Sequence, residues 1–254
     1  MARTIVVGDI HGMLAPLVEL VDTLHVTSED TLVFLGDLVD KGPDSAGVVK
    51  YVRTLSEEGI ARVVLVKGNH EGKHQRWRKK VNDGDHAGAM AMKRGEEIEQ
   101  ITAGLSQADI DFLDSAVLFH RADGYLFVHA GVPGDLTAIP DTVGEVAALP
   151  GKARKKLELL TFTRYIDCES GRMLPLGEEK DDDPFWADEY DGRFGRVVFG
   201  HQPWKDGPRY FPNAVGIDTG AVHGFGLTAL VIEGGKESTV TIPTQQFADF
   251  YPEE

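Results

Sequence analysis

The sequence predicts an α/β fold built from two β-sheets that pack on each other. In the first half of the chain, short apolar runs alternate with helical patterns, which is typical of parallel strands joined by right-handed crossovers. The second half is richer in strands and turns, which indicates a second sheet packed on the first. A chain of 254 residues is long enough to form one large domain of this class.

The expected elements follow from the spacing of apolar residues and from the residues that flank them. Over residues 14–24, apolar side chains recur every three to four positions and form the stripe of an amphipathic helix. Pro43 starts a second helical pattern that runs to Glu58, and Ser106 with Asp109 forms a capping-box pattern. Further helices are expected at 86–103, 106–115 and 152–160. The expected strands are 3–8, 31–36, 61–67, 117–120, 124–130, 196–200, 215–218, 227–233 and 237–242.

Five short motifs place Asp, Asn or His beside glycine, and most of them directly follow an apolar run. The motifs are GDIHG (8–12), GDLVDKG (36–42), GNHE (68–71), HAG (129–131) and GH (200–201). Strands that end in this way deliver their polar side chains into one crevice at the carboxyl edge of a sheet. Because the motifs must converge, we expect residues 1–254 to form a single domain.

The residue types in these motifs indicate a centre for two metal ions. Asp, Asn and His provide mixed oxygen and imidazole ligands, which suit manganese, iron or zinc, with nickel and cobalt as further options, better than calcium. Two ions about 3.5–4 Å apart clamp the attacking and leaving oxygens of an in-line phosphoryl displacement. Asp9 and His11 are close enough in sequence to approach one ion, and Asp37 is suited to bridge both. The second ion is completed by Asn69, His129 and His201.

These motifs resemble those of the metallophosphoesterases of the phosphoprotein-phosphatase type, in the calcineurin-like superfamily. The chain matches the family's motifs in order from Gly8 to His201. The resemblance implies two mixed β-sheets packed as a central sandwich flanked by helices, in four layers, α-β-β-α. It also implies that His70 donates a proton to the leaving oxygen and that Asp40 orients the His70 ring. The implied ligands are Asp9, His11 and Asp37 for one ion, and Asp37, Asn69, His129 and His201 for the other.

Two cations are expected to bind the substrate phosphate. Lys41 stands where the family usually has Arg, so it keeps the positive charge but lacks the planar fork that holds two phosphate oxygens. The second cation is expected at Arg164, with Arg94 as the alternative. The basic segment 73–80 is either a wall of the crevice that attracts a polyphosphate or a solvent-exposed helix face. The other histidines fit no motif and are interpreted as structural: His25, His74, His86, His120 and His223.

Composition excludes several classes of protein. A formal net charge of −15 argues against a protein that coats duplex nucleic acid. No apolar stretch approaches the roughly 20 residues of a membrane span, and a strand from residue 3 leaves no room for a secretory signal. Cys168 is the single cysteine and has no internal partner for a disulfide, so a cytoplasmic protein is expected. The irregular segment 134–195 is interpreted as a cap or specificity insert beside the site.

The expected function is hydrolysis of phosphoric esters or anhydrides by a metal-bridging hydroxide that attacks phosphorus in line. Residues 216–234 look like the corresponding region of bacterial dinucleoside tetraphosphatases, so dinucleoside polyphosphates such as diadenosine tetraphosphate are the favoured substrates. A serine/threonine phosphatase acting on phosphoproteins is the alternative; a pseudoenzyme and a nuclease are minor ones. Trp186, Tyr190 and Trp204 either stack on bases or pack in the core.

Overall fold

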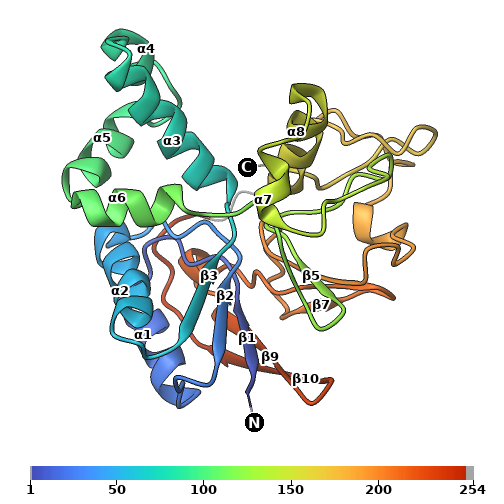
Figure 1. Cartoon of the computed structure of the whole chain (residues 1–254), viewed down its shortest axis with the longest axis horizontal. Coiled ribbons are helices and arrows are strands. Elements are labelled where there is room, and N and C mark those ends of the chain that lie inside the picture. The colour runs from blue at the N-terminus through green and yellow to red at the C-terminus, as the bar shows by residue number, and fades with distance from the viewer. Residues whose placement is uncertain (1, 250–254) are drawn as a thin grey trace.

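The computed structural model describes residues 2–249 and contains two five-stranded sheets. The first sheet has the order β10-β9-β1-β2-β3, and the second has the order β4-β5-β6-β8-β7 (Figure 1). The strands of the first sheet are β1 (Thr4–Val7), β2 (Thr31–Phe34), β3 (Arg62–Leu65), β9 (Leu227–Glu233) and β10 (Lys236–Ile242). Those of the second are β4 (His120–Ala122), β5 (Tyr125–Phe127), β6 (Arg196–Phe199), β7 (Arg209–Tyr210) and β8 (Ala214–Gly216).

Parallel pairing brings the ends of the motif-bearing strands to common edges. β1, β2 and β3 pair in parallel, with α1 (Leu14–Thr23) and α2 (Ser45–Glu57) as the intervening helices. In the second sheet, β5, β6 and β8 are also parallel. β9 runs antiparallel to β1 in the first sheet, and β4 runs antiparallel to β5 in the second, so both sheets are mixed, as expected.

Alternation along the strands explains why the two sheets pack face to face. Ile5 and Val7 point into a core shared with α1 and α2, whereas Val6 points to the other face. That other face holds residues from both sheets, including Phe127 and Val198. Because both faces of the first sheet are buried, its central strands read as continuous apolar runs in the sequence. The predicted central sandwich flanked by helices is confirmed.

A helical arm extends from β3. It consists of α3 (Asn69–Asn82), α4 (His86–Met90), α5 (Gly95–Ala103) and α6 (Gln107–Asp114), and it forms the upper left lobe in Figure 1. The prediction of one helix over 86–103 is wrong in one respect, because the helical conformation is interrupted between α4 and α5. At the break Arg94 adopts φ +64°, a left-handed conformation that cannot continue a right-handed helix.

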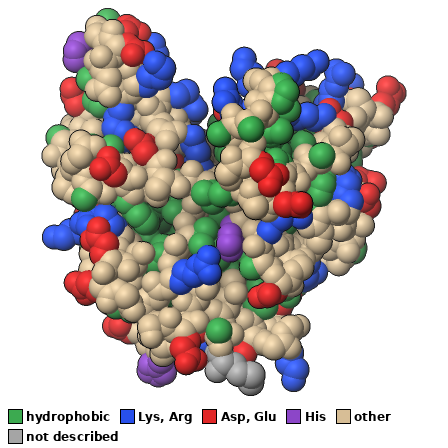
Figure 2. Space-filling model, viewed as in Figure 1, with side chains coloured by type: hydrophobic (Ala, Val, Ile, Leu, Met, Phe, Trp, Pro, Cys, Tyr) green, Lys and Arg blue, Asp and Glu red, His purple; other side chains and the backbone are tan. Residues whose placement is uncertain are grey.

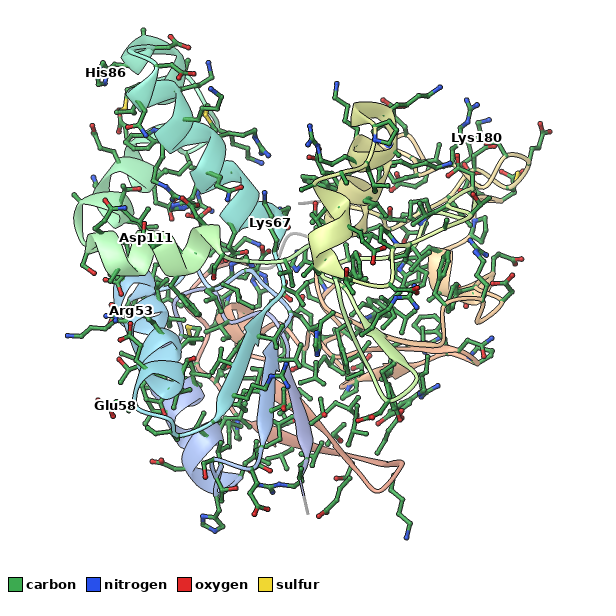
Figure 3. The ribbon with its side chains drawn as sticks, in the orientation of Figure 1. Arg53, Glu58, Lys67, His86, Asp111 and Lys180 are labelled. Atoms are coloured by element: carbon green, nitrogen blue, oxygen red, sulfur yellow. The ribbon has the colours of Figure 1, made fainter. Side chains whose placement is uncertain are left out.

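Residues 134–195 form most of a second lobe (Figure 1). Their helices are short: α7 (Val143–Val146), α8 (Gly151–Glu158), η1 (Leu159–Thr161) and η2 (Trp186–Asp188). The helix predicted at 152–160 is confirmed by α8 and η1. Figure 3 places Lys180 in this lobe and His86 near the tip of the helical arm. Figure 2 shows a notch between the lobes, with Lys and Arg side chains on both shoulders.

Two further strand predictions need correction. The strand expected at 117–120 begins only at His120, and Val117 instead makes an isolated bridge to Val66. The two-residue strand β7 was not predicted, since a segment this short carries no alternation. None of the helices in residues 2–249 is both long and apolar enough to cross a bilayer.

Candidate metal centre

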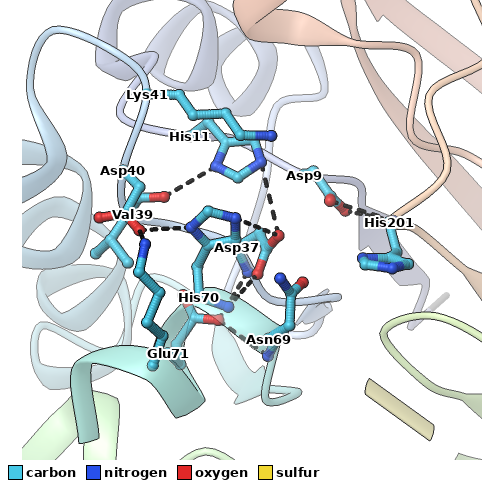
Figure 4. A network of polar contacts seen from close by, with 12 residues as sticks. Asp9, His11, Asp37, Val39, Asp40, Lys41, Asn69, His70, Glu71 and His201 are labelled. Atoms are coloured by element: carbon cyan, nitrogen blue, oxygen red, sulfur yellow. Dashed lines mark hydrogen bonds and ion pairs between the residues drawn. The ribbon is translucent and has the colours of Figure 1, made fainter. Parts of the chain in front are cut away.

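All five motifs lie at the carboxyl ends of the parallel strands. Asp9 lies two residues beyond β1, His129 two residues beyond β5, and His201 two residues beyond β6. Asp37 and Asn69 follow β2 and β3 at slightly greater separations. The sandwich therefore brings residues that are up to 192 positions apart into contact, since both oxygens of Asp9 accept from the backbone N–H of His201 at 3.1 Å (Figure 4).

Asp37 lies at the centre of the cluster. Its Oδ2 is 3.6 Å from Nε2 of His11, 3.5 Å from Nε2 of His129 and 3.9 Å from Nε2 of His70. Ligand atoms of His11, Asp37 and His70 lie within 4.8 Å of one another, and so do those of Asp37, His129 and His201. Asp37 is common to both groups, which is the arrangement that a bridging carboxylate requires.

The histidine rings are held in the orientation that suits metal ligands. Nδ1 of His11 donates to the carbonyl of Val39 at 2.9 Å, and Nδ1 of His129 donates to the carbonyl of Leu35 at 2.8 Å. In each case the backbone acceptor fixes the tautomer and leaves Nε2 facing Asp37. Oδ1 of Asn69 lies 2.9 Å from Nε2 of His129, so it reaches the same point. The donor set therefore fits divalent cations.

Electrostatics also favour a cation at this position. Asp9 is buried beside Asp218, and burial together with that second carboxylate raises the pKa of Asp9 well above its usual value. Burial alone would lower the pKa of His129, but the charges of Asp37 and Asp9 outweigh it and raise this pKa to about 10. A proton on His129 thus offsets part of the negative charge, and a divalent cation would offset it more completely.

Backbone strain is concentrated in the same loops. Five of the residues in this site have positive φ values, between 47° and 70°. They are His11, Asp37, Asp40, Lys41 and His201. Such conformations are uncommon for residues other than glycine and cluster at functional sites, because the surrounding structure must hold them in place.

Glu71 connects two of the loops, a role that its motif did not predict. Its carboxylate accepts backbone N–H groups from Asp37 at 2.8 Å, Leu38 at 2.8 Å and Gly68 at 2.9 Å. Glu71 thereby fixes the loop that carries Asp37 against the start of α3, which carries Asn69 and His70. The sequence clue was the acidic residue at the end of GNHE, in the first turn of a helix.

Asp40 has three partners on α3. Nδ1 of His70 donates to its Oδ2 at 2.5 Å, Nζ of Lys73 to the same oxygen at 3.1 Å, and Nε2 of His74 to Oδ1 at 2.7 Å. Burial would raise the pKa of Asp40, but the hydrogen bonds from the two histidines outweigh it and hold this pKa well below its usual value. His74 is buried and hydrogen-bonded, as its interpretation as a structural histidine expects, but its partner is a residue of the site.

One cavity of about 700 Å³ adjoins this cluster. Its wall includes the predicted cations Lys41 and Arg164, and Nη2 of Arg164 donates to the carbonyl of His201 at 3.2 Å. Asp218, which belongs to none of the five motifs, also lines it, and burial raises the pKa of this carboxyl to about 6. Its clue was a position two residues beyond β8, the spacing that Asp9 and His129 also show.

The aromatic residues of the cavity differ from those expected. Trp186 and Tyr190 are buried in the core of the second lobe, and Trp204 packs there against Phe185, so packing is their role. The cavity wall instead contains Phe162 and Tyr165. His223 also lines the cavity.

The calcineurin-like phosphoesterase family model matches residues 2–231. The chain belongs to this family. It is therefore a metal-dependent phosphoesterase, and membership implies divalent metal ions at the centre described above.

Similar proteins have related names. The chain is 33% identical to the asymmetrical bis(5'-nucleosyl)-tetraphosphatase PrpE of Bacillus velezensis, over 88% of this chain and 86% of that protein. It is 27% identical to the symmetrical bis(5'-nucleosyl)-tetraphosphatase of Stutzerimonas stutzeri, over 92% and 95%. A crystal structure of a provisional diadenosine tetraphosphatase is 28% identical, with a TM-score of 0.68 over 96% of this chain and 94% of that one. A yeast serine/threonine phosphatase shares the fold, with a TM-score of 0.57 and 17% identity, over 99% of this phosphoesterase and 82% of that chain.

Proposed function

We propose that this phosphoesterase hydrolyses dinucleoside polyphosphates such as diadenosine tetraphosphate. The cavity carries this proposal, because it joins the cluster around Asp37 to cationic and apolar walls and has the volume of a nucleotide-sized site. The names of the relatives support the same substrate class.

The ligand assignment within the centre is part of the proposal. Two divalent ions, with manganese favoured, would be held through a shared Asp37. The remaining ligands are Asp9 and His11 for one ion, and Asn69, His129 and His201 for the other. Bound ions supply Lewis acidity and lower the pKa of water at the site.

The chain itself supplies proton transfer and substrate binding. His70 faces the cluster through Nε2 while Asp40 holds Nδ1, so the ring is oriented to donate a proton to the leaving oxygen. Lys41 and Arg164 lie on the cavity wall, where they would neutralise phosphate oxygens as charge develops. Lys41 would do so as a point charge rather than through two parallel hydrogen bonds.

The placement of the chain in the cell and its division into parts are also proposals. We place the protein in the cytoplasm on the single cysteine, Cys168, which is exposed and has no partner for an internal disulfide. We treat residues 1–254 as one domain in which 134–195 is a cap, since Phe162 and Arg164 of this segment line the cavity.

A manganese-supplemented assay tests the substrate. Diadenosine tetraphosphate is compared with a phosphoserine or phosphothreonine peptide at equal enzyme concentration. We expect kcat/KM to be at least about tenfold higher for the dinucleotide, a difference of about 1.4 kcal/mol in transition-state stabilisation. Turnover of the peptide with the dinucleotide left intact would favour the protein phosphatase instead.

A further inference from the structure

The cavity has two chemically different walls that come from different lobes. Four cations from the helical arm and from the loop at 36–42 line it: Lys41, Lys73, Lys93 and Arg94. Apolar and aromatic residues from the other lobe also line it: Phe162, Tyr165, Met173, Leu174, Pro175 and Leu176. Phe162 and Leu176 are 40% and 45% exposed, although both are large apolar side chains. Exposed apolar surface beside a cationic wall suits a ligand with both a flat base and several phosphates.

The turn at Lys93 and Arg94 is tied to the loop at 36–42. Glu97 accepts the backbone N–H of Lys41 at 3.3 Å through one carboxylate oxygen, and its other oxygen pairs with Nε of Arg94 at 2.5 Å. Arg94 is held in a left-handed conformation at the start of α5. The same carboxylate therefore places the turn beside the loop that carries Asp37 and Lys41, rather than leaving it free at the end of the arm.

Only some of the cations in this wall form ion pairs with acidic side chains of the protein. Lys73 pairs with Asp40, and Arg94 pairs with Glu97. Across residues 2–249, by contrast, the ammonium groups of Lys41 and Lys93 form no hydrogen bond or ion pair. Lys41 lies beside His11 (Figure 4), so Lys93 is the unpaired cation left for a more distant anion.

We propose that Lys93 and Arg94 form a second phosphate subsite, which binds a phosphate of the substrate beyond the one that reacts. The apolar wall at Tyr165 and Leu174 receives a base of the same substrate. This inference rests on the proposed function and deepens it, because it assigns the preference for polyphosphates to the turn between α4 and α5. A simple phosphate monoester would occupy only the reacting site and would not sense these two residues.

The test uses Lys93→Gln and Arg94→Gln, singly and together, in the full-length enzyme at constant free Mn²⁺. The matched control is Lys79→Gln, a lysine of α3 that is 74% exposed and paired with Asp83, outside the cavity. We expect the double variant to raise KM for diadenosine tetraphosphate at least about tenfold, the loss of one or two charge-assisted hydrogen bonds. Hydrolysis of p-nitrophenyl phosphate should change less than about twofold in the same variant.

Two outcomes separate this inference from the proposed function. If the wild-type enzyme does not cleave diadenosine tetraphosphate, the proposed function fails, and inorganic tripolyphosphate is then tested as an inhibitor of p-nitrophenyl phosphate hydrolysis. A tenfold weaker inhibition constant in the double variant would still support the subsite. An unchanged constant, or equal changes for both substrates in the variant, would overturn it. Calorimetric binding of tripolyphosphate to the metal-free protein gives the same comparison without turnover.

A separate observation concerns His74. Asp40 is fully buried and has one oxygen for each histidine, with Oδ2 facing His70 and Oδ1 facing His74. His70 and His74 are four residues apart on α3 and so project from the same face of the helix. His74 is itself fully buried, and in the described part of the chain its Nδ1 has no hydrogen-bond partner. Among residues 2–249, the His74 ring therefore makes its hydrogen bond to Asp40 alone.

We infer that His74 is a positioning residue for His70. With Oδ1 bound by His74, the Asp40 carboxylate cannot rotate without breaking a buried hydrogen bond, so Oδ2 remains aimed at Nδ1 of His70. The inference rests on the proposed role of His70 as proton donor. Such a role matters most when the leaving group is weakly acidic.

The test compares phenyl phosphate with p-nitrophenyl phosphate in His74→Leu and His74→Gln. Phenol has a pKa near that of tyrosine, about 10, and needs a proton donor more than the acidic nitrophenol does. We expect His74→Leu to lower kcat for phenyl phosphate about tenfold more than for p-nitrophenyl phosphate. His74→Gln, whose amide can still donate to Oδ1, should restore the ratio to within about twofold of wild type.

The controls keep this test decisive. If His74→Leu fails to fold, His74→Asn replaces it, since its shorter amide cannot span the same distance. Equal loss on both substrates would show a purely structural role and overturn the inference. If His70→Ala also lowers kcat equally for both substrates, the proposed role of His70 fails first.

Discussion

At the scale of single residues, Glu71 shows how one buried side chain can hold together the loops of a candidate metal centre. Its carboxylate accepts three backbone N–H groups, two from the loop of Asp37 and one from Gly68. Both carboxylate oxygens accept from these donors. An N–H group in place of either oxygen would therefore point at a backbone N–H and repel it. The two loops that supply Asp37 and Asn69 therefore depend on one buried acceptor.

Replacing Glu71 by Gln should weaken metal binding. The amide nitrogen would face a backbone N–H, so the loop would shift and the apparent Mn²⁺ affinity should fall about 10- to 100-fold. Activity measured against free Mn²⁺, with calorimetry as a second measurement, checks this. Glu96→Gln, at an exposed position in the first turn of α5, serves as the control. An unchanged Mn²⁺ affinity in Glu71→Gln would contradict the assignment.

The motifs at the strand ends predicted which side chains would meet, but not how these side chains are supported. The six expected ligands lie together because each follows a strand of the sandwich, and strand ends can be read from apolar runs. His74 could not be found in this way. Its role depends on being four residues from His70 on α3, and α3 has no apolar stripe that would mark it in the sequence.

At the scale of elements, the loops that follow β2 and β3 approach each other so closely that a glycine is required between them. Gly36 has φ +99°, and a Cβ added there would lie 2.4 Å from the backbone nitrogen of Gly68. Gly36→Ala should therefore lower the free energy of unfolding by about 3 kcal/mol or more, from overpacking and backbone strain together. Urea denaturation measures the change.

Gly59 provides a matched control for this prediction. It also has a positive φ, +67°, but nothing lies within 4 Å of an added Cβ. Gly59→Ala should cost only the conformational strain, about 1–2 kcal/mol. If both variants lose the same stability, contact between the loops does not restrict Gly36.

The start of β1 is joined to the turn before β2 by an ion pair that makes stability depend on pH. Nη2 of Arg3 donates to Oδ2 of Asp30 at 2.6 Å, and the N–H of Thr27 donates to the same oxygen at 2.9 Å. The hydrogen bond from Arg3 is the main cause that lowers the pKa of Asp30 to about 2. A carboxyl whose pKa is lowered by folding stabilises the fold above its unfolded pKa and loses that contribution as pH falls.

Between about pH 4 and pH 2, the wild-type protein should therefore lose about 2 kcal/mol that Asp30→Asn does not lose. At pH 7 the variant should be less stable than wild type by a similar amount. Urea denaturation at several pH values provides both numbers. Asp111→Asn, on the exposed part of α6, should keep the wild-type pH dependence. If the free energy of unfolding of Asp30→Asn kept the wild-type dependence on pH, the ion pair between Arg3 and Asp30 would contribute little to stability.

At the scale of the whole molecule, the sandwich was predictable because both of its sheets leave a clear pattern. Val6 and Val33 of the first sheet meet Phe127 and Val198 of the second in one buried layer, so strands in both read as apolar runs. The two lobes were less predictable. The arm bends at Arg94, whose residue type does not predict a left-handed conformation although Gly95 follows it. Residues 134–195 are mostly loops whose course depends on contacts with the rest of the chain.

Charge is also distributed at this scale, and it acts on the substrate in two opposing ways. The formal net charge of −15 repels a polyphosphate at long range, whereas the cations around the cavity attract it at short range. The Debye length falls from about 10 Å at 0.1 M salt to about 3 Å at 1 M. At 0.1 M salt, the repulsion between the substrate and distant acidic residues is therefore already largely screened. The interaction that higher salt can still weaken is the attraction between the substrate and the cations of the cavity.

Raising KCl from 0.1 M to 1 M should therefore increase KM for diadenosine tetraphosphate by about fivefold or more. Hydrolysis of p-nitrophenyl phosphate, which carries less charge and contacts fewer cations, should change by less than about twofold. Initial rates at fixed free Mn²⁺ measure both. If the acidic surface dominated instead, screening would remove repulsion and KM for the dinucleotide would fall. The sign of the change thus identifies which charges the substrate senses, and a decrease would contradict a cavity whose cations bind the phosphate chain.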